Sequence, residues 1–194
     1  MITKDIEATG YKRWTKHKQL PKLEWQRLFK KLKYTTVDTK LRWFQYRILH
    51  SILSTNRSVS KFIHGQDHLC TFCKKESETI IHLLWDCPKI TIVWNELAGI
   101  SNSRAIHSYN FKFTKWLVIF GQCDIIKTDL VCDLIILLGK YYIYRCKVQN
   151  KELSLKIFTN ELYNRYCIEK TISKDSLQFK IKWAPYTNIF KSIM

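Results

Sequence analysis

The segment CTFCKKESETIIHLLWDCP, residues 70–88, decides how this chain of 194 residues folds. It supplies three cysteines and one histidine, at Cys70, Cys73, His82 and Cys87. Three thiolates and one imidazole that close a shell of four ligands suit tetrahedral Zn²⁺ best, and such a shell leaves no open position for a catalytic water. The sequence therefore predicts a structural zinc site that shapes the protein and performs no chemistry.

The spacing of the ligands predicts how the chain encloses the metal. Two residues between Cys70 and Cys73 allow one tight turn to aim both sulfurs at one point, and the second pair of ligands must come from an element folded back onto this turn. Residues 77–86 are predicted to form that element as a helix, with Ser77 as its N-cap and Glu78 near its positive start.

The second ligand pair does not fit a regular α-helix. His82 and Cys87 are five residues apart, which is about 140° around an ideal α-helix, so the last turn has to unwind for both to reach one ion. Pro88 favours this unwinding because it disfavours helical geometry at the preceding residue. The alternative is that these residues are ordinary core thiols and a hydrogen-bonded core histidine. We interpret only the unpaired cysteines in that way: Cys123, Cys132, Cys146 and Cys167.

Composition predicts an all-α protein. Hydrophobic residues make up 46% of the chain, and only five Gly and three Pro are present, so turn signals are too sparse for a many-stranded sheet. Helical periodicity is found at 23–32 and 37–53, further helices are expected at 90–97 and 153–166, and residues 113–120 and 130–148 are apolar stretches of the predicted C-terminal bundle. We expect a helical domain with a Cys-Cys-His-Cys zinc knuckle followed by a small helical bundle. The predicted division is a basic N-terminal segment (1–20), the zinc-binding helical domain (21–100) and the C-terminal bundle (101–194).

The cysteine count and the hydropathy of the chain indicate in which cellular compartment the protein is expected. Seven cysteines, an odd number, together with a metal-type arrangement and no signal peptide, favour a reducing intracellular compartment over a disulfide framework. The nucleus and the cytoplasm both fit. The longest apolar run, 134–138, is far shorter than the roughly 20 residues of a membrane-spanning helix, so no membrane association is expected.

The charge of the chain is strongly positive, with 33 Lys and Arg against 16 Asp and Glu, a net charge of +17. From Lys12 to Arg47 there are twelve basic residues, and only Glu24 and Asp38 oppose them. Cations interleaved with aromatic rings are typical of single-strand nucleic-acid binding. The rings are Trp14, Trp25, Phe29, Tyr34, Trp43, Phe44 and Tyr46. The alternative is a pair of amphipathic helices with buried rings and solvated lysines.

Seven basic residues are the candidate nucleic-acid contacts. Lys40, Arg42 and Arg47 lie on the polar side of the predicted helix 37–53. Arg57 and Lys61 follow in a polar turn and a short helical segment. The last two, Lys74 and Lys75, extend from the tip of the knuckle, where they could contact phosphate or offset the negative charge of three thiolates on one zinc ion.

The stretch from Leu41 to Trp94 resembles the zinc-binding domain downstream of the polymerase in non-LTR, LINE-type retrotransposon reverse transcriptases. The matching parts are Leu41, Arg42 and Phe44, the turn Thr55-Asn56-Arg57, the knuckle cysteines, Glu78 with His82 and Leu83, Cys87-Pro88, and Trp94. The resemblance implies zinc ligands at Cys70, Cys73, His82 and Cys87, and basic helical residues that hold template RNA or target DNA. Lys74 departs from the family, which often has Gly or Asn there.

A polymerase of this family would carry a Tyr-x-Asp-Asp strand, but the 194 residues contain no adjacent Asp-Asp pair. Metal-dependent nucleotidyl transfer needs clustered carboxylates, so we expect no enzymatic activity. The chain looks like a separated or truncated C-terminal portion of such a protein. The predicted function is a noncatalytic, zinc-stabilised module that binds RNA or DNA, with a reverse-transcriptase polymerase domain as a further partner. The alternative is a zinc-stapled helical adaptor for an acidic protein.

Overall fold

The computed structural model describes residues 9–17, 22–102, 112–121, 130–173 and 176–183, and Phe190. This part of the chain is helical, and its only β-type contact is an isolated bridge between Leu69 and Ser77. The prediction of an all-α fold is therefore confirmed. The elements are α1 (Thr9–Thr15), α2 (Lys22–Thr35), α3 (Thr39–Leu49), α4 (Asn56–Val59), the π-helical turn η1 (His82–Asp86), α5 (Pro88–Asn102), α6 (Lys115–Phe120), α7 (Leu130–Val148), α8 (Leu155–Ser173) and α9 (Leu177–Trp183).

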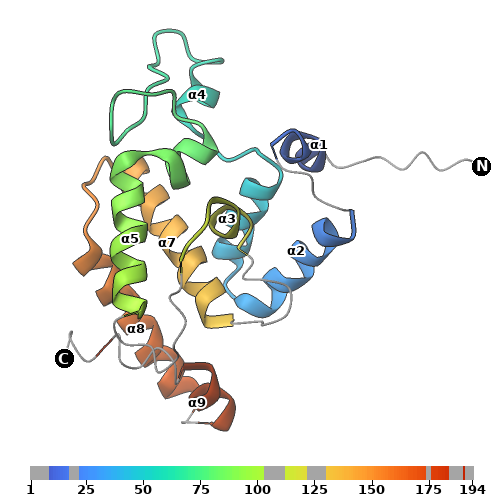
Figure 1. Cartoon of the computed structure of the whole chain (residues 1–194), viewed down its shortest axis with the longest axis vertical. Helices are drawn as coiled ribbons and strands as arrows, with labels where there is room; N and C mark the ends of the chain where they lie inside the picture. The colour runs from blue at the N-terminus through green and yellow to red at the C-terminus, as the bar shows by residue number, and fades with distance from the viewer. Residues whose placement is uncertain are drawn as a thin grey trace, which may run out of the picture.

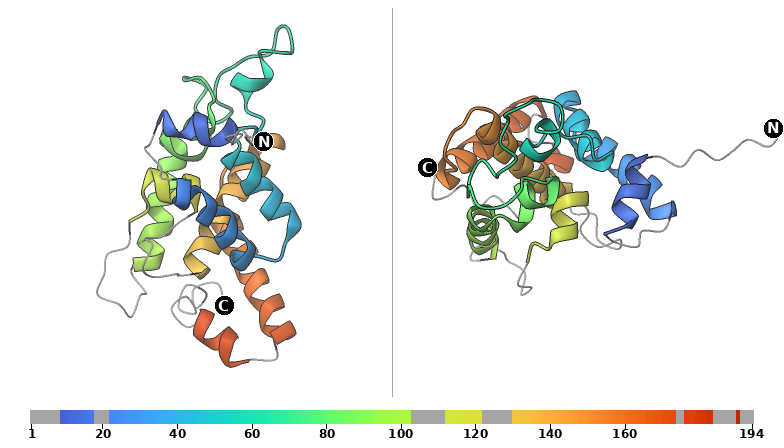
Figure 2. Two further views of the ribbon diagram at one scale, coloured as in Figure 1. Left: turned by 90° about the vertical axis from the view of Figure 1, so that its right-hand side faces the viewer. Right: turned by 90° about the horizontal axis from the view of Figure 1, so that it is seen from above.

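Helix α7 is the centre of the molecule, and α2, α3, α6, α8, α9 and η1 all pack against it (Figures 1 and 2). Its buried residues occupy every side of the helix, which is the pattern of a fully enclosed helix. Gly139 allows the indole of Trp94 on α5 to come close, because a Cβ at this position would lie 2.9 Å from the Trp94 ring. The central helix thereby joins the N-terminal helices to the C-terminal ones.

Helix α1 has no counterpart among the predicted helices, and it covers the end of α3. The indole Nε1 of Trp14 donates hydrogen bonds to the backbone oxygens of Ile48 (3.1 Å) and Leu49 (2.9 Å). These carbonyls belong to the last turn of α3, and that of Ile48 also accepts from the backbone amide of Ser51 at 2.9 Å. Gly10 permits this contact, since a Cβ there would lie 2.3 Å from the Leu49 oxygen. Trp14 is therefore a structural residue.

A single hydrophobic cluster includes buried side chains from α1 through Phe190. The regions predicted as the zinc-binding domain and the bundle contact each other, at α3 with α7 and at α5 with α8. Helix α5 extends from Pro88 to Asn102, across the predicted boundary between residues 100 and 101, and residues 103–111 lie outside the described part of the chain. The division into 1–20, 21–100 and 101–194 stays a prediction. None of the helices described is long and apolar enough to cross a bilayer.

The core also contains a buried charge cluster. Lys140 on α7 has no exposed surface and donates to Oε1 of Gln45 and to the backbone oxygen of Ile119. Asp133, two turns earlier on α7, forms an ion pair with Lys31 at 2.6 Å. Burial disfavours the charged ammonium and lowers the pKa of Lys140 to about 7, although the charge of Asp133 acts in the opposite direction.

This lysine is expected to make stability rise with pH above about 7. Between pH 7 and its ordinary pKa of 10.5, the native state keeps the amine neutral while the unfolded chain still binds a proton. The free energy of unfolding should therefore increase by up to about 1.4 kcal/mol per pH unit. Below pH 7 both states are protonated, and the contribution is constant and least favourable. Urea unfolding of zinc-loaded protein at several pH values measures this slope.

Lys140→Met should remove that part of the slope, whereas Lys156→Met, at an exposed position on α8, should leave it intact. Cysteine titration contributes equally to all three proteins, so the difference between the slopes isolates Lys140. Identical slopes for the wild type and Lys140→Met would show that the amine is not held neutral.

Candidate metal centre and nucleic-acid interface

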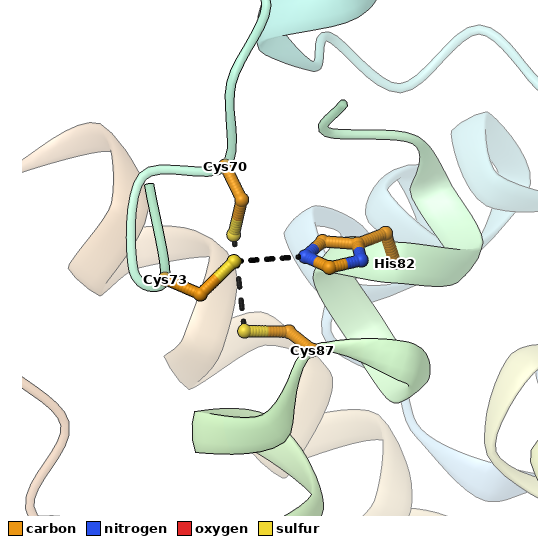
Figure 3. Close-up of side chains that lie close together, drawn as sticks. All are labelled: Cys70, Cys73, His82 and Cys87. Carbon is orange, nitrogen blue, oxygen red and sulfur yellow. Dashed lines mark hydrogen bonds between the residues drawn. The ribbon is translucent and has the colours of Figure 1, made fainter. Parts of the chain in front are cut away.

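The four predicted ligand side chains converge on one point (Figure 3). Their ligand atoms all lie within 4.8 Å of one another. Sγ of Cys70 is 3.8 Å from Sγ of Cys87, and Sγ of Cys73 is 3.3 Å from Nε2 of His82. Sulfurs placed tetrahedrally at a Zn–S distance of about 2.3 Å are about 3.8 Å apart, so these side chains fit a zinc ion. Three of the four residues are buried, and Cys73 is half-buried.

A tight turn and a π-helical turn bring the two ligand pairs together. In the first, the amide of Lys74 donates to the backbone oxygen of Cys70 at 3.0 Å. In the second, the amide of Cys87 donates to the backbone oxygen of His82 at 3.0 Å, which is the five-residue bond of a π-helix. This bond places residues five apart on one side of the helix. Cys87 itself is extended, as expected before Pro88.

The sequence prediction for the start of this helix was wrong. The backbone of Ser77 pairs with Leu69 in the β-bridge, so Ser77 is not an N-cap. The hydroxyl of Thr79 takes that role and accepts from the amide of His82 at 2.9 Å. Both residues are hydroxyl-bearing and only two positions apart, so local sequence does not distinguish them; the pairing of the 69 and 77 backbones does.

Glu78 is the residue of the site whose role is hardest to predict from the sequence. Instead of lying at a helix start, its fully buried carboxylate accepts hydrogen bonds from the amide of Asn56 (2.9 Å) and from the amide and hydroxyl of Thr71 (both 2.8 Å). Lys147 of α7 adds an ion pair at 3.4 Å. One carboxylate thus connects α4, the knuckle turn and the central helix. Its position between the ligand pairs and its place among the residues that resemble the family are the sequence signals that point to Glu78, and neither indicates this role.

A second acidic residue orients the histidine ligand. Oε2 of Glu76 lies 3.2 Å from Nδ1 of His82, on the opposite side of the ring from the sulfurs. A carboxylate that accepts the second ring N–H of a metal-bound histidine fixes its tautomer and increases its basicity. Nε2 of His82 is then the nitrogen available to the metal.

The thiol of Cys70 donates a hydrogen bond to the sulfur of Cys87. The hydrogen bond from Cys70 to the Cys87 sulfur raises the pKa of Cys70, with burial adding to the rise, and lowers the pKa of Cys87. The lower pKa makes a thiolate easier to form at Cys87 than at Cys70. Because a thiolate is the form that binds metal, a bound cation would displace the remaining protons.

Lys74 has a left-handed backbone, with φ of 57°. Gly and Asn adopt this conformation more readily than Lys does. Lys74→Gly is expected to increase the free energy of unfolding of the zinc-loaded protein by up to about 1 kcal/mol, because relief of the strained backbone outweighs the extra entropy of glycine in the unfolded chain. Denaturant midpoints measure the change.

The neighbouring Lys75 provides the matched control, since its φ is not positive. Lys75→Gly removes the same side chain and adds the same chain entropy without relieving strain, so it should destabilise the protein. If both glycine variants lowered the midpoint equally, the left-handed turn would not carry strain.

The seven predicted nucleic-acid contacts fall into two regions. Arg57, Lys61, Lys74 and Lys75 are exposed on α4, on the loop after it and on the knuckle turn, at one end of the molecule (top of Figure 1). Lys40 and Arg47 are on α3, where Lys40 is exposed and the guanidinium of Arg47 lies 5.6 Å from the ring centre of Tyr144.

Arg42 has a structural task in addition to any contact with nucleic acid. Its Nε donates to the backbone oxygen of Thr36 at 2.6 Å, and its Nη2 donates to that of Lys33 at 2.8 Å. These carbonyls follow or end α2, so the guanidinium satisfies acceptors that the helix leaves free. A substitution at Arg42 would therefore affect folding as well as charge.

The structure also sorts the aromatic residues of the basic stripe. Trp14, Trp25 and Phe44 are buried in the core. By contrast, Tyr34 is 73% exposed and Trp43 is 57% exposed. For the three buried rings the alternative interpretation, ordinary core packing, is the correct one.

The fold and the site together define a helical protein organised around a closed Cys₃His metal site. Residues 8–94 match the family described as zinc-binding in reverse transcriptase. This segment is therefore a reverse-transcriptase zinc-binding domain, which is an accessory domain and not a catalytic one, and its cofactor is zinc. The match confirms the resemblance to a reverse-transcriptase zinc-binding domain. The matched segment begins at residue 8, before α1, and ends at Trp94. No curated protein and no solved structure is significantly similar to the chain.

Proposed function

We propose that this protein is a noncatalytic nucleic-acid-binding module in which zinc fixes the shape of a basic surface. The surface consists of Arg57, Lys61, Lys74 and Lys75, which we call the knuckle patch. The zinc site has no chemical task in this proposal, because its four protein ligands complete the coordination shell. A polymerase domain of a reverse transcriptase, on the same or another chain, is the proposed partner.

The exposure of the knuckle patch carries this proposal. All four side chains are exposed, and none forms an ion pair with a residue that the structure describes. Among the acidic residues of the same end, Glu78 is buried against Lys147, Glu76 faces His82, and the exposed Asp67 accepts from the amide of Leu69. Solvated cations without ion-pair partners in a chain of net charge +17 attract a polyanion.

The local fold explains how the metal holds this patch in place. Asn56, the first residue of α4, donates through its side chain to the backbone oxygen of Leu69 at 2.7 Å, directly before the first ligand Cys70. Its amide reaches Glu78, between the two ligand pairs. Because α4 is tied to the knuckle in this way, the metal fixes Arg57 as well as the two lysines of the turn.

A salt titration of affinity for single-stranded RNA and DNA tests the proposal. Affinity should fall linearly with salt on logarithmic axes, through counterion release. Replacing the four residues of the knuckle patch with Gln should weaken binding and reduce the slope by about 3, given roughly 0.7 per phosphate contact on a single strand. Removal of zinc should have a similar effect, since the patch then loses its fixed shape.

The matched control removes four charges elsewhere: Lys112, Lys156, Lys170 and Lys180, all exposed, are replaced by Gln. This variant has the same net charge as the patch variant, but the salt dependence of its affinity should stay close to that of the wild type. Equal losses in both variants would mean that only net charge matters. Absence of binding to either nucleic acid at low salt would favour the alternative, an adaptor for an acidic protein.

A further inference from the structure

Three rings form a ladder along the outer side of α3. Trp43 and Tyr46 are stacked, with ring centres 5.0 Å apart and planes 9° from parallel. His50 continues the series at 4.1 Å from Tyr46. Phe29 and the buried Trp25 of α2 contact His50 at the inner end. The ladder is anchored in the core at one end and exposes Trp43 at the other.

Helices α2 and α7 both pack against α3 (Figure 1). Contacts with α2 are made by Tyr46, and contacts with α7 by Phe44. Trp43 lies between these contacts on the helix, so its second face is directed away from both neighbours, in agreement with its exposure of 57%. A rigid, half-exposed indole of this kind presents a flat apolar surface to solvent.

Two basic side chains flank this ring along α3. Lys40 and Arg47 lie one turn before and one turn after Trp43, on the same side of α3. The Nε of Arg47 is buried and has no hydrogen-bond partner among the residues described. The only acidic residue from 25 to 53 is Asp38, and it is occupied as the N-cap of α3 and by Arg165.

We propose that the outer side of α3 binds single-stranded nucleic acid, with one base stacked on Trp43 and the flanking phosphates on Lys40 and Arg47. This inference rests on the proposed function and adds to it the strandedness of the ligand and the residue that recognises a base. Every base has an aromatic face, so stacking is tolerant of sequence, whereas the bases of a duplex are already stacked on each other. The ring therefore selects for unpaired strands.

Arg47 and Lys147 connect the outer side of α3 to the zinc knuckle. Arg47 and Lys147 both lie over the ring of Tyr144, at 5.6 Å and 5.9 Å. Lys147 in turn reaches Glu78 inside the knuckle. A chain of contacts thus connects Arg47, beside Trp43, to the zinc knuckle through Tyr144 and the nearly buried Lys147.

The test compares Trp43→Ala and Trp43→Phe with the wild type on three probes about 12 nucleotides long, a common site size. The probes are oligo-uridine or oligo-thymidine, an abasic strand with the same phosphates, and a DNA duplex. Trp43→Ala should weaken binding of the base-bearing single strand about 5- to 100-fold and leave binding of the abasic strand and the duplex unchanged. Trp43→Phe should retain most of the affinity. Ile172→Ala, which truncates a side chain that is 76% exposed on α8, should change none of them.

Each outcome separates this inference from the function on which it rests. If the wild type binds with the expected salt dependence but Trp43→Ala matches it on single strands, the base-stacking role is wrong and the nucleic-acid module stands. If Trp43→Ala weakens all three probes equally, the ring supports only the fold of α3. If the wild type binds no nucleic acid, both proposals fail, and an exposed indole beside cations would then indicate a protein partner.

Discussion

Removal of zinc is expected to unfold the segment from residue 54 to residue 87 and to lower the thermal midpoint of the whole protein. This segment has little regular structure beyond α4 and η1 and depends on the four ligands for its shape. Structural zinc contributes about 10–16 kcal/mol in small zinc domains. Most of the single hydrophobic cluster comes from the helices outside the knuckle, so we expect them to stay folded while the free energy of unfolding falls by several kcal/mol.

Three measurements test this expectation. Elemental analysis should find about one zinc per chain, as a closed set of four ligands requires. Cys87→Ser should lose the metal and melt at a lower temperature. Hydrogen exchange of the metal-free protein should be fast in 54–87 and remain slow in α7. A metal-free protein with the melting curve and the exchange pattern of the wild type would refute the zinc site.

Cys167→Ser is the matched control for the ligand variant. Cys167 is a half-buried thiol on α8 that lies outside the ligand cluster. The substitution exchanges the same atoms as Cys87→Ser but should retain the metal and most of the stability. If the two serine variants behaved alike, loss of a thiol, and not loss of a ligand, would explain the result.

Glu78→Gln is expected to destabilise the zinc-loaded protein by about 3–5 kcal/mol, since it breaks a buried ion pair. The carboxylate accepts from Asn56 and Thr71 with both oxygens, and an amide offers only one acceptor. One buried N–H then faces an amide group that cannot accept, and the ammonium of Lys147 loses its counter-charge. Denaturant unfolding with zinc in excess measures the loss.

Glu161→Gln provides the comparison, because Glu161 also pairs with a basic residue but at the surface. Its side chain is 43% exposed and its partner Arg145 is 38% exposed, so the loss should be below about 1 kcal/mol. Combining Glu78→Gln with Lys147→Met should recover part of the stability, since no unpaired charge remains. A small effect of Glu78→Gln alone would mean that water, and not Lys147, compensates the carboxylate.

The metal ligands could be predicted from the sequence because their chemistry is local. Cys70 and Cys73 are held by one turn, and the closing pair with Pro88 follows within one short element. The sequence also indicated that an α-helix cannot present His82 and Cys87 to one ion. What it could not specify was the solution, a π-helical turn in place of simple unwinding, since both relieve the same mismatch.

The helices were predictable from periodicity, whereas the role of individual side chains on them was not. Periodicity shows that α3 has an apolar side, but it does not show that Arg42 turns back to the end of α2. Nor does it distinguish the buried Trp14 and Trp25 from the exposed Trp43, since all three are large apolar residues among cations. Helix α1 was missed because seven residues are too few for a clear period.

The sequence alone determined the ligand set, the helical class of the fold and the excess of positive charge, because each depends on residue type and on spacing along a short stretch. The tertiary structure decided which of these residues share a neighbourhood. Glu78 became the link between α4, the knuckle and Lys147, and Trp43 was left as the exposed end of a ring ladder. These outcomes depend on which surfaces α7 covers, and contacts between residues nearly seventy positions apart, such as Glu78 with Lys147, are not encoded in any local pattern.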